Sequence, residues 1–436
     1  MNPLIKRFFH YIIPSIAAMW VYSLYTMVDG YFIANYVGPV EFSAINIAMP
    51  FVNTIFALAI IFAVGTSTLV GISLGRGEKK KANEIFSTTL CILSLAALGI
   101  TLFFRFRLDQ IVTLLGATPH TKVFVHDYIL IVLHFCIFFM VSYNFEVIIK
   151  VDGFPVLATI GVIASALTNV LLDYIFVAKF HWGVKGAAWA TGIAQVFSTI
   201  LFLYHFVFGK SQLQFTKNIK MGFLKQVFPI GTGDFIAEMS LGIIVFLFNH
   251  FLPRTLGEES LISYTVVSYV SLLITMTMTG LVQGVQPLIS LYLGKREIPT
   301  VKKLLSYGFM GIGIASLLSI FLVNVWTKEI TGLFLSDVTP KILHMTYQAL
   351  RRYSTAYLFL GFNLLCGGYF AAVGKARPSI FINVSRGFVF IVLALTFTSK
   401  VLAPPMIWYS ALISEAITFV LGMSLIYINF KYLVKN

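Results

Sequence analysis

Most of this chain consists of apolar runs that are long enough to cross a lipid bilayer, and these runs constrain its fold more than any other feature. A membrane helix needs about 20 apolar residues to span a hydrocarbon core about 30 Å thick. Of the 436 residues, 58% are hydrophobic and only 11% are charged, whereas about 25% of the residues in a soluble domain are charged. The composition therefore predicts an all-α integral membrane protein.

The positions of the apolar runs predict twelve transmembrane helices. Their expected ranges are 9–36, 44–74, 84–104, 123–149, 154–178, 183–209, 226–251, 259–293, 303–326, 342–372, 378–400 and 404–429. The N-terminal segment runs into the first range without a small-residue cleavage site, so we interpret it as a membrane helix and not as a cleaved signal peptide. Cys91, Cys136 and Cys366 lie in separate runs and indicate neither a disulfide framework nor a metal site.

The net charge of +14 is distributed unequally between the two sets of loops. With the N-terminus inside, nineteen lysines and arginines, Lys435 among them, fall in cytoplasmic segments and nine fall on the opposite side. The positive-inside rule then places both termini in the cytoplasm. Because the basic residues are scattered over short loops instead of forming one face, they do not indicate a nucleic acid partner.

The two halves of the chain repeat one another at an offset of 219 residues. The clearest stretch pairs LGRGEKKKANEIFS at 74–87 with LGKREIPTVKKLLS at 293–306. An even number of helices per repeat makes the halves parallel, and such halves move to give alternating access in many transporters. We expect an N-lobe at 1–209, a cytoplasmic linker at 210–225, either on the inner leaflet or in solvent, and a C-lobe at 226–436. No ATP-binding P-loop motif is present, so an ion gradient is the expected energy source.

Polar residues within the predicted spans indicate an ion pathway. A carboxylate at a helix centre costs about 2.5–3.5 kcal/mol on insertion, so it usually serves ions or protons. The candidates are Asp29, Asn169, Asp173 and Thr191. Asn169 and Asp173 are four residues apart and share a helix face. Oxygen ligands of this kind suit protons or sodium, and residue types alone leave both open. A structural alternative is that Asp29 caps a broken helix and that Asp173 lies at the external interface near Lys179.

Four motifs, spread over both halves, carry a resemblance to a known family. They are DGYFIANYVG at 29–38, GTSTLVGISLGRGEKKKA at 65–82, GLVQGVQPLISLYLGK at 280–295 and GYFAAVGKARPSIFINVSR at 368–386. With these motifs the chain resembles the MATE (multidrug and toxic compound extrusion) transporters, and within them the MepA-type bacterial branch. The resemblance implies a V-shaped pair of six-helix lobes in the bacterial plasma membrane. It also implies secondary active efflux of amphiphilic, cationic drugs or toxic compounds by antiport with protons or sodium.

The resemblance also implies roles for individual residues. The cation site in the family's N-lobe uses an acid on the first helix, an Asn and an Asp on the fifth and a Thr on the sixth, and these positions match Asp29, Asn169, Asp173 and Thr191. Pro14 matches a proline at which the first helix bends in some members. We expect no cofactor other than the coupling ion, H⁺ or Na⁺, and no metal except sodium at this site. The expected partners are small amphiphilic substrates and the bilayer, and the expected state is a monomer.

One feature departs from the family's other pattern, in which the C-lobe holds the cation. Glu238 lies on the seventh predicted helix with Asp234 one turn before it, but the interiors of the eighth and tenth helices carry no acid. The C-lobe cation site is therefore incomplete in this chain. Asp234 and Glu238 are candidates for binding the positive charge of a substrate, or alternatively lie near the cytoplasmic mouth.

Several further residues are candidates for a substrate cavity. They are Gln283, Gln286, Tyr143, Asn144, Asn363 and Arg386. Gln283 and Gln286 lie beside Pro287 and either bind a ligand or satisfy carbonyls freed by the proline. Arg386 either contacts the substrate or forms a structural ion pair with a partner such as Glu415. On the fourth helix, Glu146 and Lys150 share a face and are expected to pair.

Two rival functions follow from the same sequence. A flippase or exporter of a lipid-linked or other endogenous metabolite would share the fold, but it would need several basic residues in its cavity, and Arg386 is the only deep basic candidate. A membrane-embedded enzyme would need His, Asp or Ser groups clustered at an interface, and the sequence shows no such pattern. We therefore expect a transporter and not an enzyme.

Overall fold

The protein consists of helices joined by short loops, and the computed structural model describes residues 3–335 and 338–433. Lys435, counted above among the cytoplasmic residues, lies outside the described ranges. Within them, every regular element is an α-helix, a 3-10 helix or a π-helix, which confirms the predicted all-α fold. The chain divides into two compact units. Unit 1 comprises Met1–Gly231 and Gly294–Arg296, and unit 2 comprises Thr232–Leu293 and Glu297–Asn436.

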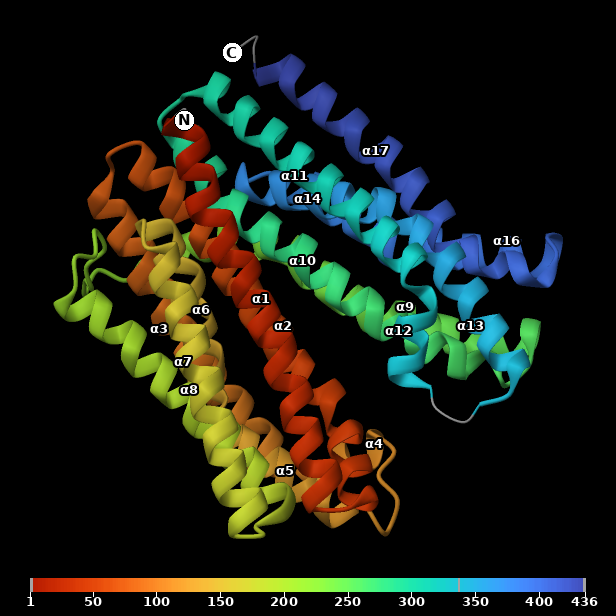
Figure 1. The fold of residues 1–436 in the computed structure, drawn as a ribbon. Helices are drawn as coiled ribbons and strands as arrows, with labels where there is room; N and C mark the ends of the chain where they lie inside the picture. Colours follow the sequence, from red (N-terminus) through yellow and green to blue (C-terminus); the bar gives the residue numbers. More distant parts are fainter. Residues whose placement is uncertain (1–2, 336–337, 434–436) are drawn as a thin grey trace. The chain divides into compact units, whose positions relative to one another are not determined.

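Unit 1 contains the helices that position the predicted ion site. They are α1 (Pro3–Tyr36), α2 (Pro39–Gly75), α3 (Lys79–Phe106), α4 (Leu108–Leu114), α5 (Lys122–His134), α6 (Cys136–Asp152), α7 (Pro155–Asp173) and α8 (Gly183–Phe208). A π-helical segment, η1 (Tyr174–Lys179), continues α7. Helix α7 packs against both α1 and α8 (Figure 1). This packing brings together residues from the first, fifth and sixth predicted spans.

Unit 2 repeats this series of helices. They are α9 (Leu224–Leu256), α10 (Ser260–Gly294), α11 (Ile298–Val325), α12 (Thr327–Phe334), α13 (Pro340–Tyr353), α14 (Tyr357–Ala372), α15 (Ala376–Val384), α16 (Phe390–Val401) and α17 (Ser410–Leu433). The start of α9 and the last residue of α10 belong to unit 1. Short 3-10 segments precede α9, α14 and α17, and a π-helical segment, η4 (Ser385–Val389), joins α15 to α16. Helix α14 packs against α11 and α17.

Among the described residues, eleven helical spans are long and apolar enough to cross a membrane, and the pair α5 and α6, bent by 54°, makes a twelfth if it is counted as one span. These spans coincide with the twelve predicted ranges, so the protein is a multi-pass membrane protein. The sequence analysis did not predict the short helices α4 and α12, because seven or eight residues are too few for a periodic pattern to be distinguished from a loop.

The sequence repeat corresponds to a repeat of helices. An offset of 219 residues carries α3, Lys79–Phe106, onto α11, Ile298–Val325, at both ends. Helices α2 and α10 end at Gly75 and Gly294, which are equivalent glycines in the repeated motif. A π-helical segment follows the corresponding helix in each half, at η1 and at η4. Both units are therefore built on one six-span plan.

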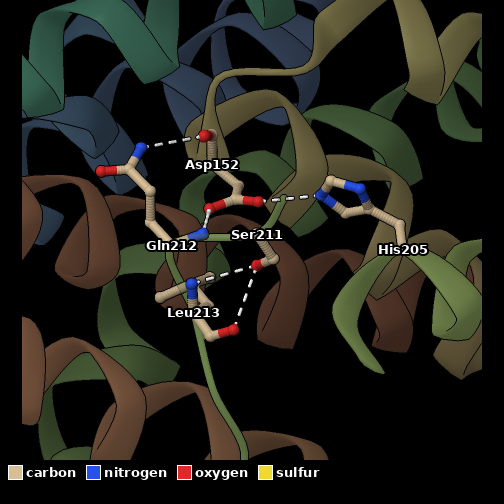
Figure 2. Close-up of polar contacts among 5 residues, drawn as sticks. All are labelled: Asp152, His205, Ser211, Gln212 and Leu213. Atoms are coloured by element: carbon tan, nitrogen blue, oxygen red, sulfur yellow. Dashed lines mark hydrogen bonds and ion pairs between the residues drawn. The ribbon is translucent and has the colours of Figure 1, made fainter. Parts of the chain in front are cut away.

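The segment between α8 and α9 is held against unit 1 by side chains that bind its backbone (Figure 2). Asp152, at the end of α6, accepts the backbone N–H of Gln212 at 2.8 Å through Oδ1, and its Oδ2 lies 2.9 Å from Nε2 of His205. The side-chain amide of Gln212 donates back to the Asp152 carbonyl at 3.1 Å. Ser211 bonds both the N–H and the carbonyl of Leu213, which is fully buried.

Helix α3 holds the rest of the same segment. The side chains of Asn83, Ser87 and Thr88 accept the backbone N–H groups of Gln214, Thr216 and Lys220, at 2.9–3.0 Å. Glu84 accepts from the Asn218 amide at 2.6 Å and from the Lys220 ammonium at 2.8 Å. A segment expected to lie on the leaflet or in solvent is thus bonded to α3 and α6 as part of unit 1.

Candidate functional site

The two acids predicted to bind the coupling ion lie together inside unit 1. Asp29 is on α1 and is 8% exposed, and Asp173, the last residue of α7, is 0% exposed. Their carboxyl groups lie close enough to interact directly. One oxygen of Asp29 and both oxygens of Asp173 have no hydrogen-bond partner. A buried carboxylate in this state is costly unless a proton or a cation neutralises it.

The amide and hydroxyl of the predicted site are adjacent to this pair. Asn169 lies one turn before Asp173 on α7 and is 2% exposed. Its Nδ2 donates to Oγ1 of Thr191 on α8 at 3.2 Å, and Thr191 donates to the Ala187 carbonyl at 3.0 Å. Because the nitrogen end of the amide is used in this way, Oδ1 of Asn169 remains without a partner. The set therefore presents unpartnered oxygens, which are the ligands that hard cations prefer.

The structural alternative was that Asp29 caps a broken helix and that Asp173 lies at the external interface near Lys179. Asp29 lies inside the continuous helix α1, which runs to Tyr36, so it caps no break. Lys179 lies over the ring of Tyr174, with its Nζ 5.2 Å from the ring centroid, and Asp173 is buried. Asp29 therefore does not act as a helix cap, and Asp173 is not exposed beside Lys179.

Two phenol groups lie near the carboxyl pair. Tyr128 on α5 is buried and interacts with both Asp29 and Asp173, and Tyr25 on α1 interacts with Asp29. The sequence analysis did not find Tyr128. Nothing in the sequence distinguishes Tyr128 from the other 19 of the chain's 20 tyrosines, because its role depends on the packing of α5 beside the site.

An aromatic row leads away from this pair. Tyr25 meets Tyr22 edge to face with ring centroids 5.2 Å apart, Tyr22 stacks on Phe56 at 5.8 Å, and Phe56 meets Tyr143 at 4.7 Å. Asn144, next to Tyr143, is fully buried and neither end of its amide has a partner. The row joins α1, α2 and α6, includes the predicted substrate-cavity residue Tyr143, and ends beside another, Asn144.

Pro14 lies within α1 and contacts α7. Its ring removes the N–H that would bond a carbonyl one turn earlier, which weakens a helix at that point. The hydroxyl of Thr159 on α7 donates to the Pro14 carbonyl at 2.8 Å. The predicted bending point of α1 is thus bonded to the helix that carries Asn169 and Asp173.

The acids of α9 belong to unit 2, apart from the carboxyl pair of unit 1. Asp234 accepts from Nε2 of Gln286 at 3.2 Å, and the same nitrogen lies 3.3 Å from the Gly368 carbonyl. Glu238, one turn along α9, is half-buried and interacts with Asp234. Gln286 therefore binds an acid of α9 and a carbonyl of α14. Gln283 is half-buried on the same helix, one turn before it.

The predicted ion pair of Arg386 is confirmed. Its Nε lies 3.2 Å from Oε1 of Glu415, and Asn363 donates to Oε2 of Glu415 at 2.6 Å. Asn363 thus lies beside the ion pair. The pairing of Glu146 and Lys150 is also confirmed, at 2.8 Å, but both side chains are buried in unit 1 instead of lying at its surface.

Comparison with known proteins identifies the family. A family model described as MatE matches the chain twice, at residues 14–175 and 234–396. This chain belongs to the MatE family. The two matches fall in the two halves of the sequence repeat. The matched relatives and solved structures are MATE transporters, which are not enzymes. This confirms that the protein is a transporter and not an enzyme.

Relatives and solved structures agree with this assignment. The multidrug export protein MepA of Staphylococcus aureus is 25% identical over 435 residues, covering 98% of this chain and 94% of the relative. MepA of Staphylococcus haemolyticus is 26% identical over 432 residues, with the same coverage. A crystal structure of MATE in complex with MaL6 and an outward-facing multidrug resistance MATE family transporter both superpose with TM-scores of 0.94. They are 20% and 19% identical, and each alignment covers 99% of this chain and 97% of the other. These structures confirm the MATE-type fold.

Proposed function

We propose that this MatE transporter exports amphiphilic, cationic compounds by antiport with protons or sodium. One observation carries the proposal, namely the buried pair of Asp29 and Asp173 with unpartnered oxygens. A charged pair in this position is destabilised by repulsion and desolvation, and a bound proton or sodium ion removes that cost. The ion therefore biases the protein between two conformations. The relatives named multidrug export proteins support the substrate class.

Coupling follows if the substrate and the ion favour different conformations. An amphiphilic cation binds while the acids are charged, the protein opens to the opposite side, and ion binding at the acids then favours release of the compound. The hydrogen bond from Thr159 to the Pro14 carbonyl links the proposed hinge of α1 to the helix that carries Asp173. By linkage, the compound must lower the affinity for the ion by the same factor by which the ion lowers the affinity for the compound.

The test is efflux of ethidium from everted vesicles with pH and sodium gradients imposed separately. We expect one gradient to drive efflux and Asp29→Asn and Asp173→Asn each to abolish it. Asp109→Asn is the matched control, because this carboxylate is 77% exposed and its one ion pair, with Lys122 at 3.7 Å, is long and lies at the surface. Efflux that survives in both site variants would refute coupling at this pair. Absence of efflux in the unaltered protein would instead favour a flippase or exporter of an endogenous metabolite.

The acids of α9 are proposed to contact the substrate's positive charge. Glu238 has a nearby acid, Asp234, and neither acid forms an ion pair with another of the described residues. Glu238→Lys is expected to reduce efflux of cationic dyes by about tenfold, the effect of losing one favourable charge contact, and to change efflux of neutral dyes little. Equal losses for cationic and neutral dyes would show that Glu238 supports the structure instead of the substrate.

The proposed location is the bacterial plasma membrane, with both termini in the cytoplasm and the protein acting as a monomer. Support comes from the excess of lysine and arginine in alternate loops and from the bacterial source of the MepA relatives.

A further inference from the structure

Arg386 is a buried cation whose hydrogen-bonding capacity is largely unused. It is 1% exposed and lies on the π-helical segment η4 of unit 2. Although its Nε is 3.2 Å from Glu415, none of its three side-chain nitrogens has a hydrogen bond of acceptable geometry. A guanidinium carries five N–H donors, and each buried donor left unpaired costs free energy.

Glu415 is held in a position from which it reaches only one edge of Arg386. Asn363 donates to both Oε2 and the backbone carbonyl of Glu415, at 2.6 and 2.8 Å. This amide fixes the carboxylate so that its other oxygen, Oε1, meets Nε. The two terminal nitrogens, Nη1 and Nη2, therefore remain as a planar fork of donors, which is the geometry that binds a carboxylate in a bidentate manner.

Arg386 and Glu415 line a pocket whose walls come from unit 2 alone. The pocket has a volume of about 100 Å³ and opens at its mouth, which is somewhat less than the cavity of about 150 Å³ that binds benzene in an engineered protein. Its walls include the rings of Tyr264, Tyr353 and Tyr357 and the side chains of Leu241 and Ile244. The Tyr357 hydroxyl is already bonded to Ser271, at 2.7 Å. Arg386 is the only basic residue among those that line the pocket.

The local backbone conformation at Arg386 supports a binding role. In unit 1, the π-helical segment η1 begins directly after Asp173, and in unit 2 the π-helical segment η4 contains Arg386. π-helical turns occur often at functional sites. Each half of the chain therefore places a buried charged side chain beside a π-helical turn, with a negative charge in unit 1 and a positive charge in unit 2.

We propose that this pocket binds the carboxylate of an amphiphilic organic anion. The carboxylate accepts hydrogen bonds from Nη1 and Nη2 of Arg386, and the apolar or aromatic body of the anion packs against the tyrosines. Glu415 competes for the same guanidinium and so limits the affinity. This site is independent of the proposed cation efflux, because it shares no residue with the carboxyl pair of unit 1.

The test is calorimetric binding to the purified full-length protein in detergent near neutral pH. The probes are phenylacetate and a cation of similar shape, 2-phenylethylammonium. We expect the anion to bind more tightly than the cation. Arg386→Gln should weaken anion binding about tenfold or more, because it removes a charge-assisted bidentate contact. Glu415→Gln should strengthen it, since a competing charge is lost, and Asp109→Asn, at a carboxylate that is 77% exposed in unit 1, should leave it unchanged.

Two further variants keep the test decisive if Arg386→Gln does not fold. Arg386→Lys keeps the charge but loses the fork, so it should bind the anion more weakly than the unaltered protein. Ser268→Phe narrows the pocket without altering the ion pair and should also weaken binding. Equal affinity for the two probes, or no strengthening in Glu415→Gln, would overturn the proposal and leave Arg386 and Glu415 as a structural, hydrated ion pair.

Discussion

The orientation of the Asn169 amide is set by its hydrogen bond to the Thr191 hydroxyl. Removing that one oxygen atom tests its importance. Nδ2 of Asn169 donates to Thr191, so Thr191→Val leaves a buried donor unpaired at a cost of about 1–3 kcal/mol. The amide is then free to rotate away from the acids. We expect the concentration of the coupling ion that gives half-maximal efflux to rise several-fold. Thr191→Ser, which keeps the hydroxyl, should behave like the unaltered protein, and similar losses in both variants would contradict this role.

Gly65 shows how closely two helices approach in unit 1. A Cβ at this position would lie 2.2 Å from the Val227 carbonyl at the start of α9. Because that neighbour is backbone, it cannot move aside, and Gly65→Ala is expected to destabilise the protein by about 1–3 kcal/mol. The measurement is thermal unfolding in detergent. Gly99→Ala is the control, since a Cβ there meets nothing within 4 Å; equal effects of the two changes would refute the close approach.

At the scale of elements, the segment between α8 and α9 is ordered by side chains instead of by its own secondary structure. The backbone N–H groups of Gln212, Gln214, Thr216 and Lys220 are all bonded to side chains of α3 and α6. We expect these amides to exchange hydrogen slowly for a loop. Asp152→Ala should speed exchange at Gln212 and leave α3 unaffected, as followed by mass spectrometry.

A matched control for this prediction is Glu78→Gln. Glu78 pairs with Lys81 at the surface, with both side chains more than 40% exposed, and such pairs contribute about 0–1 kcal/mol. No change in exchange is expected at the segment. Fast exchange at Gln212 in the unaltered protein would show that Asp152 does not hold the loop.

At the scale of the whole molecule, the number of spans fixes which loops share a side of the membrane. With twelve spans and the proposed cytoplasmic termini, we expect the linker in the cytoplasm and the loop between α4 and α5 on the outside. In a Cys91→Ala background, a membrane-impermeant thiol reagent should label His120→Cys in intact cells and label Lys217→Cys only after permeabilisation. Cys136 and Cys366 are buried and should react little. The opposite labelling pattern would reverse the proposed orientation.

The sequence predicted the spans and the repeat well, because length and apolarity are local properties of a membrane helix. It also selected Asp29, Asn169 and Asp173 as polar residues out of place in apolar runs. It did not find Tyr128 or the hydrogen bonds from side chains to the backbone of the linker. Tyrosine, serine and asparagine are common residues, and their roles here depend on which residues pack beside them in the folded protein. The sequence also did not predict the bend between α5 and α6, because no proline or glycine lies next to Phe135.

The sequence by itself determined that this protein is a twelve-span membrane protein of two repeated halves with acids in its spans, because the cost of polar groups in lipid acts on each segment separately. Only the tertiary structure decided which polar groups meet. The packing of α1, α7 and α8 brings two carboxyls with unpartnered oxygens together, and the packing around η4 and α17 places Arg386, with unpartnered nitrogens, in the wall of a pocket. Such contacts depend on helix rotation and side-chain direction, and neither is encoded by apolarity alone.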